Sequence, residues 1–144
     1  MGSVPSATEG AQLDGAVASP ALVEAQRVTS AAAEVGFDWP AVGPVRSKLD
    51  EELEELDQAI RDGERANIRE ELGDVLLTLV NLARHLDVDA EQSLAAATAK
   101  FSRRLAAVER ALARRGTALA EASMTQMQAA WEQAKLEEVE CSSG

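Results

Sequence analysis

Four carboxylates at matched spacings are the residues of this sequence best suited to chemistry. Glu52 and Glu55 are three residues apart, and so are Glu71 and Asp74. Residues three apart lie on the same side of a helix, so each pair directs two carboxylates one way. If the two helices pack antiparallel, the four carboxylates meet and repel one another unless a cation lies between them. The sequence therefore predicts a site for a hard cation, Mg²⁺, Mn²⁺ or Ca²⁺.

The first pair needs an amphipathic helix, which the pattern predicts from Pro44 to about Arg61. Its expected core stripe consists of four large apolar residues, Leu49, Leu53, Leu56 and Ile60. Glu52 and Glu55 flank that stripe, whereas Glu51 and Glu54 point away from it toward solvent.

The second pair needs a helix from near Arg65 to about His85. Its expected core stripe is Ile68, Leu72, Val75, Leu79, Leu82 and Leu86, and Glu71 and Asp74 flank it at the same offsets as the first pair. Three further polar residues continue that flank, namely Thr78, Asn81 and His85. Because Leu76, Leu77 and Val80 make the remaining sides apolar, we expect a central helix whose polar flank is enclosed. Such a helix needs more cover than four short neighbours provide, which favours a homodimer.

The remaining pattern predicts an all-α fold, a bundle of four to five helices without a sheet. Three further helices are expected at 20–35, 90–115 and 123–138, with glycines at 36, 63 and 116 as stop signals. Residues 1–18 read as a disordered lead, 19–138 as the folded domain, and 139–144 as a disordered tail.

Composition narrows the possible partners and compartment. Twenty-five acidic against 14 basic residues give a formal net charge of −11, which would repel a nucleic-acid polymer. The sequence contains neither the roughly 20 consecutive apolar residues of a membrane span nor the order of a signal peptide. Cys141 is the only cysteine, so no disulfide forms within the chain. We expect a cytoplasmic protein without a membrane partner.

Two other interpretations of the acids stay open. A di-iron site normally requires Glu-x-x-His spacing, but the only histidine, His85, lies 11 residues after Asp74. We therefore expect His85 to be a hydrogen-bonded polar group near a helix end, without a catalytic role. The second alternative is a non-catalytic helical dimer whose acids merely bind cations.

An ordered set of motifs carries a resemblance to a known family. It comprises GFDWP at 36–40, KLDEELEEL at 48–56, REELGDVLLTLVNLARHL at 69–86, KFSRRLAAVERALARRG at 100–116 and WEQAK at 131–135. Together they resemble the MazG nucleotide pyrophosphohydrolase family over about residues 20–137. The family pattern E-E-x-x-E followed by E-x-x-D is met by Glu51, Glu52, Glu55, Glu71 and Asp74.

The resemblance implies a homodimeric helical enzyme that hydrolyses a nucleoside triphosphate to the monophosphate and pyrophosphate. It implies Mg²⁺ bound by the four carboxylates named first, with Mn²⁺ as a substitute. We hypothesise that a metal-activated water attacks the α-phosphorus and that Glu52 or Glu55 accepts its proton. If the protein is an enzyme, the alternative is a pyrophosphatase of narrower substrate range, specific for dUTP, dCTP or phosphoribosyl-ATP. The domain would be either a stand-alone protein or the catalytic half of a longer one.

The resemblance also implies which residues bind the nucleotide: Lys48, Glu51, Lys100, Arg104, Trp131 and Lys135. The cations suit phosphate oxygens, and the indole suits a base. One departure bears on substrate affinity or preference, because Asn67 stands where close relatives carry a lysine four positions before Glu71.

Overall fold

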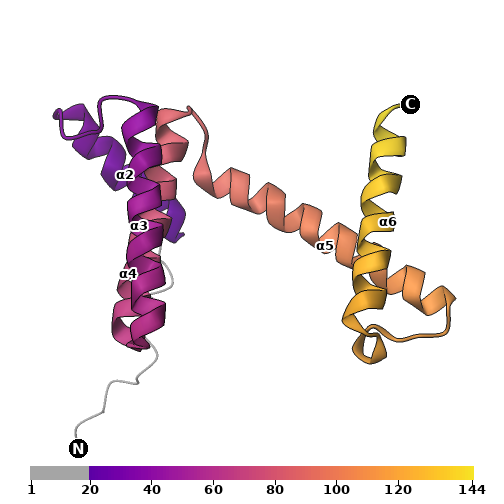
Figure 1. Ribbon diagram of the computed structural model, residues 1–144. Helices are drawn as coiled ribbons and strands as arrows, with labels where there is room; N and C mark the ends of the chain where they lie inside the picture. Colours follow the sequence, from indigo (N-terminus) through magenta and orange to yellow (C-terminus); the bar gives the residue numbers. More distant parts are fainter. Residues whose placement is uncertain (1–19) are drawn as a thin grey trace, which may run out of the picture. The chain divides into compact units, whose positions relative to one another are not determined.

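The computed structural model describes residues 20–144, and over this range the chain is helical without any strand. Five α-helices and one short 3₁₀ helix follow one another along it (Figure 1). The all-α fold predicted from the sequence is confirmed. The chain divides into two compact units, with the boundary between Ser93 and Leu94. The expected lead at 1–18 lies outside the described residues.

The first unit contains α2 (Ala21–Glu34), α3 (Val42–Asp62) and α4 (Arg65–His85), followed by the start of α5 (Ala90–Arg114). Gly63 ends α3 with a φ of 73°, a left-handed conformation that glycine adopts without strain. The two-residue connection reverses the chain, so α3 and α4 lie side by side and antiparallel (Figure 1). The predicted bounds of these helices hold to within two residues.

The buried side of α3 differs from the predicted stripe. Val45, Leu49, Glu52 and Ala59 are buried, whereas Leu53 and Ile60 are 42% and 56% exposed. Fully buried Ala59 is small, which permits α4 to approach on that side. Leu53 and Ile60 each come one residue after a buried position, about 100° further around the helix. The prediction that they belong to the core of this unit is wrong.

The buried part of α4 agrees with the predicted stripe only in part: Val75 is buried and Ile68 and Leu82 are half-buried, as predicted. Val75, Thr78 and Val80 are buried, but the predicted core residues Leu72, Leu79 and Leu86 are 42% to 54% exposed. Val75 and Val80 are five residues apart, about 140° around the helix, so α4 buries more than one side, as a helix packed against both α2 and α3 does. Enclosure of the polar flank is confirmed in part: Thr78 is 7% exposed and Glu71, Asn81 and His85 are half-buried, but Asp74 is exposed.

The second unit contains the remainder of α5, a 3₁₀ helix (Leu119–Glu121) and α6 (Met124–Ser142). Ser123 begins α6 with a capping box: its hydroxyl accepts from the Gln126 backbone N–H at 3.1 Å, and the Gln126 side chain accepts from Ser123 N at 2.8 Å. Val108, Leu112 and Ala130 form the core of this unit.

The predicted end of the last helix at residue 138 is wrong, because α6 continues to Ser142 through most of the expected tail. Two interactions explain the extension. Glu138 accepts a hydrogen bond from Arg104 Nε on α5 at 2.9 Å, and the Ser142 hydroxyl donates to the Glu138 carbonyl at 2.9 Å. Composition alone did not reveal that this acidic turn has a cationic partner.

None of the helices in the described range 20–144 is both long and apolar enough to cross a membrane.

Replacing Leu112 with alanine should destabilise the second unit by about 2 to 5 kcal/mol, because Leu112 is 1% exposed and its removal leaves a cavity. Urea unfolding followed by Trp131 fluorescence in a W39F background measures this cost. The matched change Leu136→Ala, at a site 61% exposed on α6, should stay within about 0.5 kcal/mol of the parent. Equal costs for both variants would contradict the assigned core.

Candidate metal centre

Three carboxylates meet where α3 and α4 pack against each other. Glu52, Glu55 and Glu71 each offer an oxygen, and these oxygens all lie within 4.8 Å of one another. Two come from α3 and one from α4, so the antiparallel contact assembles the group. Glu52 is buried, Glu71 is half-buried and Glu55 is exposed, so the cluster extends from the helix contact to solvent.

Two oxygens of this cluster lack a hydrogen-bond partner. Glu52 Oε2 and Glu71 Oε2 are both buried, and no described residue donates to either. A carboxylate oxygen withdrawn from water and left unpaired destabilises the fold unless a cation binds it. Burial, together with the neighbouring charges of Glu55 and Asp74, raises the pKa of Glu71 above its ordinary value. The donor set therefore fits a hard divalent cation such as Mg²⁺ or Mn²⁺.

Lys48 supplies a partial counter-charge to this cluster. Its Nζ lies 3.0 Å from Glu52 Oε1 and 3.3 Å from Glu51 Oε2. These two carboxylates raise the pKa of Lys48, Glu52 most strongly, so the ammonium form is favoured. One positive charge against three clustered carboxylates leaves the group negative. Of the residues that the resemblance assigns to the nucleotide, Lys48 and Glu51 thus lie beside the acids.

Asp74 lies at the edge of the cluster rather than within it. It is exposed and is not one of the three residues whose oxygens converge. It nevertheless lies close enough for its charge to raise the pKa of Glu71. The geometry thus brings together three of the four predicted ligands, and the role of Asp74 stays a prediction.

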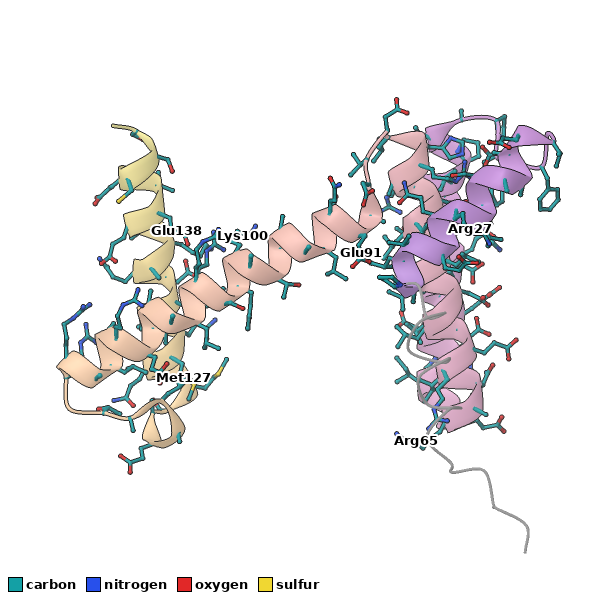
Figure 2. All side chains as sticks on the ribbon, turned by 180° about the vertical axis from the view of Figure 1, so that it is seen from behind. Arg27, Arg65, Glu91, Lys100, Met127 and Glu138 are labelled. Carbon is teal, nitrogen blue, oxygen red and sulfur yellow. The ribbon has the colours of Figure 1, made fainter. Side chains whose placement is uncertain are left out.

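The second unit holds the other residues that the resemblance assigns to the nucleotide. The Arg104 guanidinium lies 5.8 Å from the centre of the Trp131 ring, and Arg104 Nε donates to Glu138 at 2.9 Å. Phe101 packs against the same indole, with ring centres 5.3 Å apart and planes inclined by 48°. Lys100, labelled with Glu138 in Figure 2, is exposed one turn before Arg104. Lys135 is exposed and pairs with Glu132 at 3.4 Å.

A second polar cluster in the first unit was not found by sequence reasoning. Arg84 Nη2 donates to Asp38 Oδ1 at 2.7 Å, and His85 Nε2 lies 3.1 Å from the same oxygen. The Arg84 guanidinium, and then His85, hold the pKa of Asp38 well below its ordinary value. His85 is thus a hydrogen-bonded polar group near a helix end, as predicted. The motif GFDWP was a signal for Asp38, but nothing local linked it to Arg84, 46 residues away.

Comparison with known proteins places these residues in a family. Residues 44–108 match the model of the MazG nucleotide pyrophosphohydrolase domain. A nucleoside triphosphate pyrophosphohydrolase of Escherichia coli K12 is 42% identical over 123 residues, which cover 84% of this chain and 47% of that protein. A nucleoside triphosphate pyrophosphohydrolase/pyrophosphatase MazG of Thermotoga maritima is 40% identical over 116 residues, 81% of this chain and 44% of the relative. The chain thus spans about half the length of these relatives, and all three converging carboxylates fall inside the matched segment: residues 44–108 form a domain of the MazG nucleotide pyrophosphohydrolase family.

Proposed function

We propose that this protein is a Mg²⁺-dependent nucleoside triphosphate pyrophosphohydrolase, which converts a nucleoside triphosphate and water to the monophosphate and pyrophosphate. The observation that carries the proposal is the convergence of Glu52, Glu55 and Glu71, with two buried, unpaired oxygens, inside a MazG-family domain. The names of the relatives from Escherichia coli and Thermotoga maritima support the same reaction class. Since nucleoside triphosphates occur in the cytoplasm, we propose that location as well.

Glu52, Glu55 and Glu71 would hold the cation, with Asp74 at the edge as a fourth candidate ligand. When bound, Mg²⁺ neutralises charge on the triphosphate and makes a nearby water more acidic. Mn²⁺ has the same preference for oxygen ligands and should substitute for it.

Residues of the chain itself would accept the proton of the attacking water and bind the phosphates. Glu55 is exposed, so a free oxygen of its carboxylate can accept the proton of the attacking water, whereas Glu52 is buried and already accepts from Lys48. Loss of the proton leaves a hydroxide equivalent that bonds to the α-phosphorus as the bond to the pyrophosphate oxygen breaks. Lys48, at the rim, exchanges a carboxylate partner for a phosphate oxygen of the substrate.

The residues of the second unit enter the proposal through the resemblance. Lys100 and Arg104 are four residues apart on α5 and so share a face that suits phosphate oxygens. Trp131 and Lys135 are proposed to contact the nucleotide as well. Substituting each in turn and measuring KM tests these assignments.

The deciding experiment measures phosphate release, with added inorganic pyrophosphatase, from all ribo- and deoxyribonucleoside triphosphates in Mg²⁺ or in EDTA. A signal that requires both pyrophosphatase and Mg²⁺ establishes cleavage between the α- and β-phosphates. Activity confined to dUTP, dCTP or phosphoribosyl-ATP would select the narrower enzyme. Silence on every substrate would favour a metal-binding helical dimer without catalysis.

We also propose a homodimer, because α3 and α4 retain exposed apolar stripes. Leu72, Leu76 and Leu79 follow i, i+4, i+7 spacing on α4 and are 42% to 48% exposed. Leu53 and Ile60, seven residues apart on α3, are similarly exposed. Exposed apolar stripes of this length normally pack against another surface, and a second copy of the chain offers the same stripes for this.

Replacing Glu52 with glutamine should lower kcat/KM by about 100-fold or more. Loss of a residue that only hydrogen-bonds a metal ligand already lowers metal affinity or activity by about 10- to 100-fold. Glu54→Gln is the matched control, because Glu54 lies on the same helix but is exposed and outside the cluster. Its activity should equal that of the parent. Circular dichroism of both variants verifies folding, and full activity of the Glu52 variant would contradict the proposed centre.

Replacing Glu71 with glutamine should raise the melting temperature of the metal-free protein at neutral pH. The folded pKa of Glu71 is raised, so its protonated form is favoured by folding and the fold loses stability as pH rises through that pKa. The difference between variant and parent should therefore be small at acidic pH and grow toward neutrality. Added Mg²⁺ should raise the melting temperature of the parent more than that of the variant. A parent more stable than the variant without metal at neutral pH would contradict the repulsion.

Replacing Leu76 with glutamate should weaken self-association by at least about 100-fold, because the dimer would bury an unpaired charge. Sedimentation velocity over a range of concentrations measures the change. The control Val35→Glu alters an apolar residue that is 83% exposed and outside both stripes, and it should leave association intact. A parent that is monomeric at every concentration would refute the dimer directly.

A further inference from the structure

The side chain of Asp38 joins the loop before α3 to the last turn of α4. Arg84 contacts its carboxylate with two nitrogens: Nη2 lies 2.7 Å from Oδ1, and Nη1 lies 3.2 Å from Oδ2. His85 Nε2 lies 3.1 Å from the same Oδ1. A guanidinium that binds both oxygens of a carboxylate fixes the direction of approach as well as the distance. We call the three residues Asp38, Arg84 and His85 the Asp38 clamp.

The Asp38 clamp is largely withdrawn from water. The side chains of Arg84, His85 and Asp38 are only 11%, 13% and 24% exposed. Arg84 Nη2 also donates to Asn81 Oδ1 at 2.8 Å, so the guanidinium is held on α4 as well. The Arg84 guanidinium, and then His85, lower the pKa of Asp38, so its carboxylate stays charged. Because salt and water screen such a partly buried pair less than a surface pair, the loop is firmly held to α4.

Helices α3 and α4, in contrast, have no polar contact that holds them together directly. Among the described residues, no hydrogen bond or ion pair runs from α3 to α4, and the ion pairs of Arg46 and Lys48 stay within α3. The carboxylates of Glu52, Glu55 and Glu71 converge between the helices instead, and their like charges repel one another. Without a cation, this repulsion opposes the packing of α3 on α4 at the place where the metal would bind.

The α3–α4 pair is held at its two ends. Gly63 and Glu64 connect the helices at one end, and the start of α3 and the end of α4 meet at the other (Figure 1). Asp38 lies at this second end, four residues before α3 begins at Val42. The N-cap residue Ala41 makes no side-chain hydrogen bond that could fix the start of α3. The Asp38 clamp is therefore the polar contact that fixes where α3 begins relative to α4.

The clamp and the carboxylates lie far apart. Arg84 follows Glu71 by 13 residues, which is about 20 Å along the axis of α4. At that separation salt screens a direct interaction between the two charges almost completely. An effect of the clamp on the carboxylates must therefore act through the position of α3 relative to α4.

We propose that Asp38 and Arg84 are positioning residues of the metal centre. They hold the open end of the α3–α4 pair against the repulsion of the three carboxylates, and thereby set the distances between the oxygens that bind the cation. Neither residue contacts the cation itself. The inference rests on the proposed function for the identity of the centre, but its predicted effect on helix packing needs no metal.

Replacing Asp38 with asparagine should weaken Mn²⁺ binding by about tenfold or more, since residues that orient metal ligands act on this scale. The electron paramagnetic resonance signal of free Mn²⁺ measures the dissociation constant. Asp50→Asn is the matched control, because it also removes one carboxylate and one arginine partner, Arg46, but on the exposed side of α3. Its affinity should equal that of the parent. Arg84→Lys keeps the charge but loses the two-nitrogen contact, so its affinity should lie between those of parent and D38N.

A double-mutant cycle of D38N and E71Q tests the same coupling in EDTA. Urea unfolding is followed by Trp39 fluorescence in a W131F background, because Trp39 lies in the first unit. D38N should raise the unfolding equilibrium constant by a factor at least about three times smaller when E71Q has removed part of the repulsion. Distant sites without shared partners otherwise combine within about twofold. D50N in place of D38N should give such independent effects.

The outcomes separate the positioning role from the hydrolase proposal. Mn²⁺ affinities that are equal for D38N, D50N and parent would overturn the clamp even if the protein hydrolyses triphosphates. Weaker Mn²⁺ binding by D38N, with the predicted coupling to E71Q, would support the clamp even if no triphosphate is hydrolysed. Independent effects of D38N and E71Q would also overturn it, because Asp38 would then stabilise only its own loop. A parent that binds no Mn²⁺ would overturn both proposals, since there would be no centre to position.

Discussion

The first unit depends on burying the Glu52 carboxylate in the contact between α3 and α4. One of its oxygens pairs with Lys48 and the other is buried without a partner. An apolar residue at this position would pack against α4 without the desolvation of a charge. Glu71 adds a second unpaired oxygen from the opposite helix, so the contact that holds the unit together is also the place where a cation would bind. In the proposed enzyme, stability and metal binding would thus be coupled through the same few atoms.

Lys48 links cation binding at this cluster to the binding of an anionic substrate. A lysine one turn before Glu52 is a flexible point charge that neutralises part of the cluster. In the proposed enzyme a divalent cation would compete with it for the same carboxylate, and the displaced ammonium would remain beside Glu51, where an anionic substrate would approach. Cation binding would in this way prepare a phosphate contact, since the negative cluster that repels a triphosphate becomes less negative while a lysine is released.

Local signals were enough to predict the helices, but not which of their sides face each other. Gly63 and Gly116 end helices through left-handed backbone conformations that a sequence reveals directly. The carboxylate pairs also followed from local spacing. The predicted core stripe was wrong for Leu53 and Ile60, because the apolar side of α3 is wider than its contact with α4. The small, fully buried Ala59 lies within that contact, whereas Leu53 and Ile60 lie outside it. Arg84 and Asp38, 46 residues apart, are joined only by the tertiary fold, which no periodicity reports.

Helix α4 also has more apolar residues than its contacts within the unit cover, so it presents a polar side to α3 and an uncovered leucine stripe elsewhere. Its polar side runs from Glu71 to Asn81, and the exposed residues Leu72, Leu76 and Leu79 lie nearly opposite, about 150° away at 100° per residue. A helix that packed all its apolar residues within one unit would turn its acids toward solvent, where water would screen them and weaken their hold on a cation. By leaving the leucine stripe uncovered, α4 can instead turn its polar side toward α3. The exposure of Leu72, Leu76 and Leu79 therefore follows from the orientation that turns Glu71 toward Glu52 and Glu55. Any surface that covers these leucines would also stabilise the orientation on which the proposed metal centre depends.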